Sequence, residues 1–101
     1  MAIGRELHTI AWSPRALRSI DTIDEIFGTA ATQKFVRRTM AVLEHVSRNP
    51  TMFRMSEKNK HKHIALVTRN TTLYYKIKPK KKEVELLLFW DSRRNPKRLM
   101  Y

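Results

Sequence analysis

The spacing of apolar residues changes once along this chain, near His61, and that change restricts the fold more than any other feature of the sequence. Before it, apolar side chains recur every three or four residues, as on one face of a helix; after it, they alternate with polar ones, as in a strand. Helical segments followed by several strands are typical of an α+β domain. A chain of 101 residues has room for one such domain, spanning residues 1–101, with a single modest core.

The helical half consists of two segments with a short link between them. The dipeptide Ser13-Pro14 is favoured at the start of a helix, and Gly28 is favoured just after the end of one. A second helix, capped by Thr29 or Thr32, should stop at Asn49-Pro50. Because the link is short, we expect the two helices to form an antiparallel hairpin.

One strand is expected before the helices and three after them. Residues 6–12 mix apolar and polar side chains as a short, partly buried strand does. The segments 63–68, 72–78 and 84–90 are joined by short polar turns, which favours a three-stranded antiparallel meander. The last of them is apolar on both sides, as expected for a central strand.

The helices should cover one face of the sheet, so that the other face carries Tyr74, Lys76 and Lys78. The predicted fold class is therefore α+β: an N-terminal strand, an antiparallel helical hairpin and then a three-stranded antiparallel meander, with the helices on one face of the sheet. The residues expected to form the core are Leu17, Ile20, Phe27, Val36, Met40, Leu43, Tyr75, Leu86 and Leu88.

The charge of the chain indicates what it associates with. Lys and Arg number 21 against 9 Asp and Glu, which gives a formal net charge of +12. A field of this size attracts polyanions over a Debye length of about 8 Å, so nucleic acid, the ribosome or an acidic protein is the expected partner. The absence of cysteine excludes disulfides and thiolate chemistry and fits a cytoplasmic protein, and no apolar run reaches the roughly 18 residues that a membrane span needs.

Neither a metal site nor a cofactor is expected. His61 and His63 can share one side of a strand, but no cysteine and no nearby acidic residue joins them. What remains is phosphate chemistry without metal, in which Arg and Lys stabilise negative charge while His, Lys or Tyr transfers protons. Such residues fit RNA cleavage and plain binding equally well. The lysines of the turn Lys80–Lys82 are expected to be solvated surface.

The chain resembles the RelE/ParE superfamily of toxins from type II toxin–antitoxin (plasmid stabilisation) systems, both in this order of elements and in the sequence NTTLYYKI followed by EVELLLFWDSRRNPKRL. The resemblance covers nearly the whole chain, and its specific part is the last third, with Tyr75 on the second meander strand and the turn 91–96 after the third. It implies one of two activities. RelE-like members cut mRNA on the ribosome through attack of a ribose 2′-hydroxyl, whereas ParE-like members poison DNA gyrase and cut nothing. A non-toxic, basic nucleic-acid-binding module is the third alternative.

If the chain is a nuclease, the resemblance implies that Arg93 or Arg94 stabilises the charge that develops on the phosphate. The same arginines could equally contact an antitoxin or form an ion pair with Asp91. Thr71-Thr72 stand where the family carries an arginine, which keeps the ParE-like alternative open. The candidate catalytic residues are Arg93, Arg94, Lys76, His63 and Tyr101. The candidate nucleic-acid-binding residues are Arg54, Lys60, His61, Arg69, Tyr74, Lys78, Lys97 and Arg98.

The resemblance also implies an acidic antitoxin as the protein partner. A partly disordered acidic segment that folds across this chain would offset its positive charge. Met52, Phe53 and Met55 are candidate apolar anchors for that segment, and the same residues also suit an ordinary core.

Overall fold

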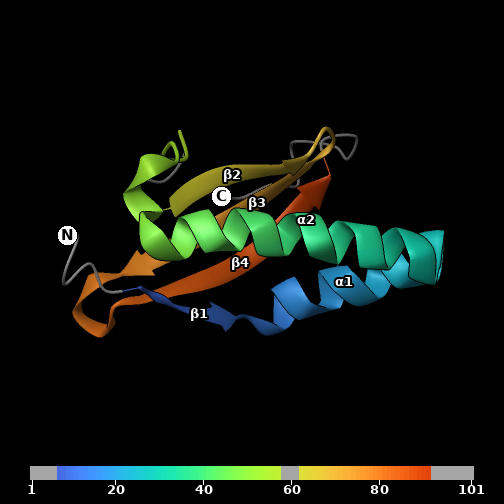
Figure 1. Ribbon diagram of the computed structural model, residues 1–101, viewed down its shortest axis with the longest axis horizontal. Helices are drawn as coiled ribbons and strands as arrows, with labels where there is room; N and C mark the ends of the chain where they lie inside the picture. The colour runs from blue at the N-terminus through green and yellow to red at the C-terminus, as the bar shows by residue number, and fades with distance from the viewer. Residues whose placement is uncertain (1–6, 58–61, 92–101) are drawn as a thin grey trace.

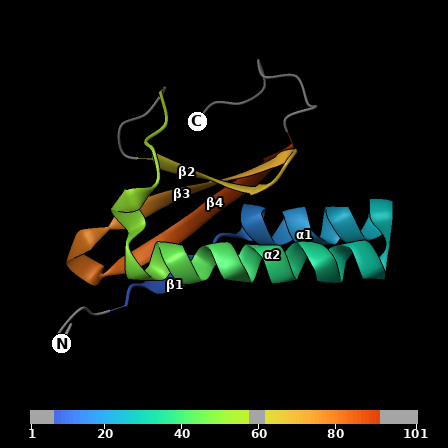
Figure 2. The ribbon, with the colours of Figure 1, turned by 45° about the horizontal axis from the view of Figure 1, so that its top comes forward.

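The computed structural model describes residues 7–57 and 62–91. Its elements, in chain order, are β1 (Thr9–Trp12), α1 (Pro14–Phe27), α2 (Thr29–Arg48), the 3-10 turn η1 (Pro50–Met52), β2 (Lys62–Thr68), β3 (Thr71–Lys78), the 3-10 turn η2 (Pro79–Lys81) and β4 (Glu83–Asp91). The sheet order is β1-β4-β3-β2, with β1 parallel to β4 and the other neighbours antiparallel. Both helices lie on one face of this sheet (Figures 1 and 2), so the predicted α+β fold is confirmed.

The helical hairpin begins and turns where the sequence predicted. The Ser13 hydroxyl accepts a hydrogen bond from the first turn of α1 (3.0 Å) and donates one to the Leu87 carbonyl (2.9 Å), which ties the helix start to β4. Gly28 alone links the helices, at a φ of 88° that favours glycine. The prediction that Thr29 or Thr32 caps α2 is wrong: the cap position is Gly28, and the Thr32 hydroxyl donates to the Gly28 carbonyl (2.9 Å) instead of accepting from a free N–H.

The helix stripe that faces the sheet differs from the predicted one. On α2 the buried residues are Phe35, Thr39, Leu43 and Val46, which follow the helical repeat. Thr39 can occupy this stripe because its hydroxyl donates to the Phe35 carbonyl (2.9 Å) and is therefore satisfied without solvent. With Thr39 at the centre, the apolar Met40 is turned outward.

The predicted core residues accordingly divide into two groups. Leu43, Tyr75, Leu86 and Leu88 are buried as predicted, Ile20 is half-buried against the core, and Val36 is half-buried. The prediction is wrong for Leu17, Phe27 and Met40, whose side chains are 52%, 56% and 56% exposed.

Strand β4 is buried on both faces, as its sequence indicated. Val84, Leu86 and Phe89 pack towards the helices, whereas Leu88 and Trp90 join Tyr74 in a second, smaller cluster. The change of side follows from the pairing with β3, in which Tyr74 lies opposite Leu88 but the next residue lies opposite Leu86. The extra residue makes a bulge in β4, which resets the alternation of side chains along the strand.

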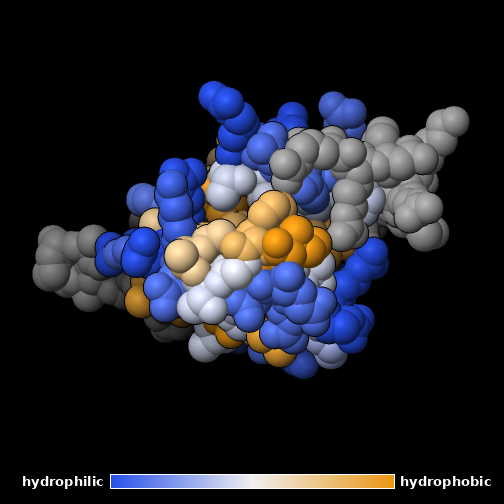
Figure 3. Space-filling view, turned by 90° about the vertical axis from the view of Figure 1, so that its right-hand side faces the viewer, coloured by the Kyte–Doolittle hydropathy of each residue, from blue (hydrophilic) through white to orange (hydrophobic). Residues whose placement is uncertain are grey.

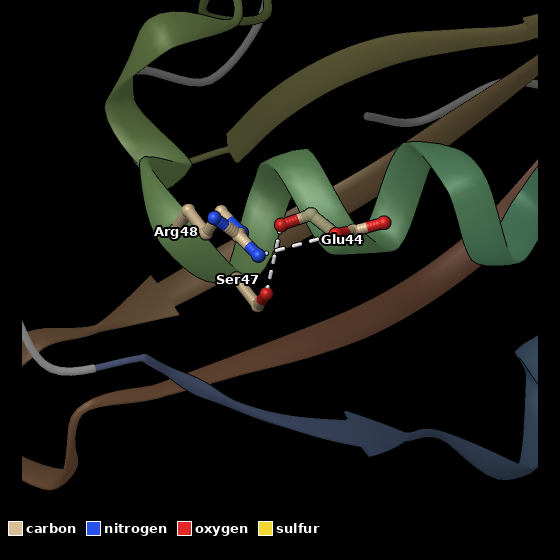
Figure 4. Close-up of polar contacts among 3 residues, drawn as sticks. All are labelled: Glu44, Ser47 and Arg48. Carbon is tan, nitrogen blue, oxygen red and sulfur yellow. Dashed lines mark hydrogen bonds and ion pairs between the residues drawn. The ribbon is translucent and has the colours of Figure 1, made fainter.

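Local polar contacts fix the end of α2. Arg48 Nη2 lies 3.2 Å from Glu44 Oε1, and Ser47 Oγ donates to the Glu44 carbonyl at 2.9 Å (Figure 4). The Ser47 carbonyl in turn accepts from the backbone N–H of His8 (2.8 Å), which holds the helix end beside β1. Among the described residues, no helix is both long enough and apolar enough to span a membrane.

Candidate nucleic-acid interface

The face of the sheet opposite the helices carries three of the six described candidate residues, Tyr74, Lys76 and Lys78. We call it the helix-free face; it comprises the outward side chains of β2, β3 and β4, namely Lys62, Ile64, Leu66, Thr72, Tyr74, Lys76, Lys78, Glu83, Glu85, Leu88 and Trp90. Tyr74 lies at its centre, between Ile64 on β2 and Leu88 on β4. The next row along the strands contains Lys62, Lys76 and Glu85.

Basic side chains gather around this centre from several elements. Burial lowers the pKa of Lys62, and the positive charges of Lys76 and Arg15 lower it further. Burial raises the pKa of Tyr74, an effect that the positive charge of Arg54 partly offsets. Strands β2 and β3, helix α1 and the segment before β2 therefore all contribute positive charge to one place. A bound anion would relieve the mutual repulsion of Lys62, Lys76 and Arg15.

Lys78 differs from the other lysines of this face because it has acidic partners. Its Nζ lies 3.7 Å from Glu83 Oε1 and 3.6 Å from Glu85 Oε1, all three side chains being about one-third exposed. These carboxylates offset its charge, so Lys78 is less available to phosphate than Lys76. Its predicted contact with nucleic acid stays a prediction.

The structure does not bring His63 together with Lys76 and Tyr74. His63 follows Lys62 on β2 and therefore points to the helix side, where its ring stacks on that of Tyr75 (centroids 5.5 Å apart, planes at 17°). It is 9% exposed, and its Nδ1 has no hydrogen-bond partner within the part of the chain that is described. From this position His63 faces the core, and its predicted catalytic role stays a prediction that this geometry does not favour.

Burial of His63 gives an expected pH dependence of stability. Burial lowers the pKa of His63 below its ordinary value of about 6.5, so the unfolded chain takes up this proton more readily than the folded one. The free energy of unfolding should therefore be constant in this respect above pH 6.5 and should fall as the pH drops from about 6.5 towards the lower folded pKa. Urea denaturation between pH 5 and 8 checks this.

His63→Phe should remove this part of the pH dependence, because the apolar ring keeps the stacking on Tyr75 without the titration. His45→Gln, at an exposed position on α2, is the matched control and should leave the pH-dependent loss attributed to His63 in place. Equal profiles for the wild type and His63→Phe would contradict this account.

Tyr75, which carried part of the sequence resemblance, is a core residue. It is fully buried, and its hydroxyl donates to the Pro50 carbonyl at 2.5 Å. Burial raises the pKa of Tyr75, which keeps the phenol protonated. Its role is therefore to join β3 to the segment that follows α2.

The two described candidate arginines lie far apart. Arg54 precedes β2, where its carbonyl accepts from the Ile64 N–H (2.9 Å), and its side chain is exposed near Tyr74. Arg69 lies in the β2–β3 turn, at the opposite end of β2 from Lys62. Six strand positions separate Lys62 from Thr68, or about 20 Å, so Arg69 does not join the lysine row.

Several predicted residues lie outside the described ranges. They are Lys60, His61, Arg93, Arg94, Lys97, Arg98 and Tyr101. Thr71 pairs with Asp91, so the turn that carries Arg69 sits at the end of β4 from which the chain continues to Arg93 and Arg94.

Sequence reasoning missed Lys62 and Arg15. Strand alternation could have found Lys62, because it is two positions from Ile64 and therefore shares its face. Nothing in the sequence marks Arg15, which approaches from α1 only because β1 and α1 lie beside β4. Among described residues, no three His, Asp or Glu side chains are grouped so that they could hold a metal ion.

Comparison with known proteins gives matches at the level of the fold. No protein-family model and no curated protein matches the chain. Among solved structures, the chain is similar to one from the toxin–antitoxin complex RelBE2 of Mycobacterium tuberculosis (TM-score 0.59, 17% identity, 85% of this chain and 92% of that one). It is also similar to a chain of the chromosomal ParDE system of P. aeruginosa (TM-score 0.67, 12% identity, 84% and 96%). A third match is a mutant of the E. coli toxin RelE in the free state (TM-score 0.63, 13% identity, 86% and 85%).

Proposed function

We propose that this protein, which has the fold of the RelE and ParE toxins, is the toxin of a type II toxin–antitoxin system. We further propose that it acts as a metal-independent endonuclease on mRNA at the ribosome. The observation that carries the proposal is the pairing of Lys62 with Lys76 next to Tyr74 on the helix-free face, where the positive charge of Arg15 also acts on Lys62. Cations that repel one another across a strand pair are stabilised by a polyanion, and RNA supplies one phosphate charge per nucleotide.

In this mechanism Lys62 and Lys76 hold the backbone phosphates on either side of the scissile bond. The ribose 2′-oxygen attacks the neighbouring phosphorus, a P–O2′ bond forms and the P–O5′ bond breaks, which leaves a 2′,3′-cyclic phosphate and a 5′-hydroxyl. One group must accept the 2′ proton and another must protonate O5′. Lys62 and Lys76 act as cations in this scheme, and Tyr101, the predicted catalytic candidate whose phenol could transfer a proton, lies outside the described residues. Arg93 or Arg94 stabilises the charge developing on the phosphate.

A ParE-like action on DNA gyrase is the second candidate, and Thr72 favours it. Thr72 lies on the helix-free face between Leu66 and Trp90, two positions from Tyr74. Its row carries no cation, whereas the arginine that RelE-like members are expected to carry there would contact the phosphate. Loss of such a contact typically lowers the rate of cleavage by about 10² to 10³, so a chain without it is expected to be a much slower nuclease.

An acidic antitoxin is the proposed protein partner. Met52 and Met55 are 56% and 55% exposed and stay candidate anchors for it. Phe53 is half-buried, packs against the core and meets Tyr75 edge-on with ring centroids 6.4 Å apart. Phe53 is therefore better suited to hold η1 on the sheet than to contact a partner.

Replacing Lys62 and Lys76 together by Ala should weaken RNA binding and abolish toxicity while the chain stays folded. Each lost phosphate contact to single-stranded RNA should lower the slope of log K against log[salt] by about 0.7, so the double variant should lose about 1.4. The measurement is the affinity for a short single-stranded oligoribonucleotide at several salt concentrations, together with growth arrest on induction.

The matched control is Lys80→Ala with Lys81→Ala, which removes the same charge from two exposed residues of η2. It should change the slope and the growth arrest much less. If the η2 variant loses as much binding as the Lys62/Lys76 variant, general charge governs the affinity and the helix-free face is not the RNA site.

A further inference from the structure

The two ends of α2 differ in what they bring to the rest of the molecule. At its start, where α1 passes into α2, the surface shows an apolar patch bordered by hydrophilic side chains (Figure 3). At its end the chain passes through η1 into a segment that lies beside the start of β2 (Figures 1 and 2). Arg54 belongs to this second segment, so the position of its guanidinium depends on how the segment is attached to the sheet.

Residues 54–56 pair with the start of β2 in an antiparallel register. Met55 lies opposite His63 in a β-bridge. Two backbone hydrogen bonds flank this bridge, from the Ile64 N–H to the Arg54 carbonyl (2.9 Å) and from the Ser56 N–H to the Lys62 carbonyl (2.7 Å). This is the bonding pattern around a non-hydrogen-bonded pair of an antiparallel ladder. The segment is therefore held at the outer edge of β2 in the way that a short edge strand is.

This register places the Arg54 side chain on the same side of the sheet as the helix-free face. Side chains opposite one another in an antiparallel pair point to the same face, so Arg54 shares the face of Ile64. Ile64 in turn lies opposite Tyr74. Neighbouring strands lie about 4.8 Å apart, which puts the Cα atoms of Arg54 and Tyr74 about 10 Å apart. The effect of the positive charge of Arg54 on the pKa of Tyr74 agrees with this position.

Arg54 thereby adds a guanidinium to the lysines of the proposed RNA site. Lys62 and Lys76 form the next row, two residues or about 7 Å further along the strands. Arginine can hold a phosphate through two parallel N–H bonds, whereas lysine acts as a point charge. A guanidinium at the end of the Tyr74 row can therefore fix the orientation of an RNA backbone that the lysines attract.

The segment that carries Arg54 is anchored to the core from the helix side, through Tyr75. The Tyr75 hydroxyl donates to the Pro50 carbonyl (2.5 Å), and both residues are buried. The Phe53 ring meets the Tyr75 ring edge-on, with centroids 6.4 Å apart and planes at 87°. Pro50 begins η1 and Phe53 directly follows it, so Tyr75 contacts both ends of that turn. The backbone next to Arg54 is thus fixed by a residue of β3.

We propose that Tyr75 is a positioning residue for the RNA site: by holding η1 on the core, its hydroxyl keeps the guanidinium of Arg54 on the helix-free side as a phosphate contact. This inference rests on the proposed function, because it assigns Arg54 to RNA. Loss of the hydroxyl leaves the buried Pro50 carbonyl without this donor, and the segment shifts towards solvent to regain one. Arg54 moves with the segment, although Tyr75 itself faces the core.

The test compares Tyr75→Phe with Thr39→Val in the full-length chain. Both changes remove a buried hydroxyl that donates to a backbone carbonyl, but Thr39 lies in the middle of α2 and contacts no part of η1 through that bond. Arg54→Ala should weaken binding of a short single-stranded oligoribonucleotide about tenfold and lower the slope of log K against log[salt] by about 0.7. Tyr75→Phe should reproduce most of both losses. Thr39→Val should change the affinity by less than about twofold.

Double variants separate positioning from a general loss of stability. In the Arg54→Ala background, Tyr75→Phe should have no further effect on the affinity for RNA, because the contact that it positions is already gone. In the Lys76→Ala background, Tyr75→Phe should keep its full effect, because Lys76 makes an independent contact.

Hydrogen exchange measures the attachment of the segment without RNA. The amide protons of Ile64 and Ser56, which form the two bonds to the segment, should exchange about tenfold faster in Tyr75→Phe. Phe53→Leu, which removes the edge-on ring contact at the other end of η1, is the second variant and should act in the same direction. Thr39→Val should leave both exchange rates unchanged.

Three results would overturn the inference while leaving the proposed function in place. They are a loss from Tyr75→Phe that persists in the Arg54→Ala background, equal losses of RNA affinity in Tyr75→Phe and Thr39→Val, and unchanged exchange of the two amides in both η1 variants. A wild-type chain that binds no oligoribonucleotide gives a different result, because it overturns the proposed function and the phosphate contact of Arg54 together.

Discussion

Leu86→Ala is expected to lower the free energy of unfolding by about 2–5 kcal/mol. Leu86 is fully buried at the centre of β4, opposite Trp12 of β1 on one side and Tyr75 of β3 on the other. Truncation there removes apolar contacts with the helix-side core and leaves a cavity that the neighbouring strands cannot fill without breaking register. The loss is a large share of the roughly 5–15 kcal/mol that stabilises a domain of this kind.

Leu66→Ala is the matched control, because it makes the same chemical change on β2 at a side chain that is 65% exposed. It should cost no more than about 0.5 kcal/mol. Urea denaturation of both variants at pH 7 provides the measurement. Similar losses for Leu66→Ala and Leu86→Ala would contradict the assignment of the core to the helix side of the sheet.

Replacing both Arg93 and Arg94 by Ala is expected to abolish growth arrest while leaving the chain folded. If these arginines stabilise the charge developing on the phosphate, their loss should lower the rate of cleavage by about 10² to 10³. Arginines outside a buried pair contribute little to stability, so thermal unfolding should change by only a small amount. Growth after induction and a circular-dichroism melt measure the two effects.

The η2 variant Lys80→Ala with Lys81→Ala serves again as the control, since it removes two charges at the other end of β4. It should remain toxic. If the arginine variant is folded and fully toxic while the η2 variant loses toxicity, the active site lies at the η2 end of the sheet. The assignment of the site to Arg93 and Arg94 would then be wrong.

The sequence predicted the elements well because each is marked by local chemistry. Ser13-Pro14, Gly28 and Asn49-Pro50 delimit the helices where the structure has their ends. The change to alternating polarity predicted β2, β3 and β4, and the apolar run 84–90 predicted the central position of β4. Each of these signals involves only a few neighbouring residues, so the elements could be predicted without knowing the tertiary structure.

The orientation of the elements was harder to predict, because it depends on packing. On α2 the centre of the buried stripe is Thr39, a polar residue that the search for apolar spacing passed over. On β2 both faces contain apolar residues, and the smaller set, Ala65 and Val67, faces the helices while Leu66 is exposed. A strand with two apolar faces does not indicate which one is buried, so the side of His63 could not be assigned from the sequence.

The candidate site was predicted in part. Tyr74 and Lys76 were correctly placed together on the face opposite the helices. The approach of Arg15 to Lys62 joins residues 47 positions apart in the sequence and depends on the parallel pairing of β1 with β4. The ion pairs of Lys78 with Glu83 and Glu85 likewise could not be predicted without knowing the register in which β3 pairs with β4.

Mapping of RNA 5′ ends and of DNA breaks in the same cells, shortly after induction of the wild type and of the Lys62/Lys76 double variant, tests the central claim most directly. The account predicts new 5′ ends inside translated messages with the wild type, their loss in the variant, and intact DNA in both. DNA breaks with intact messages would contradict it, and would identify the chain as a ParE-like gyrase poison instead of a ribosome-dependent nuclease.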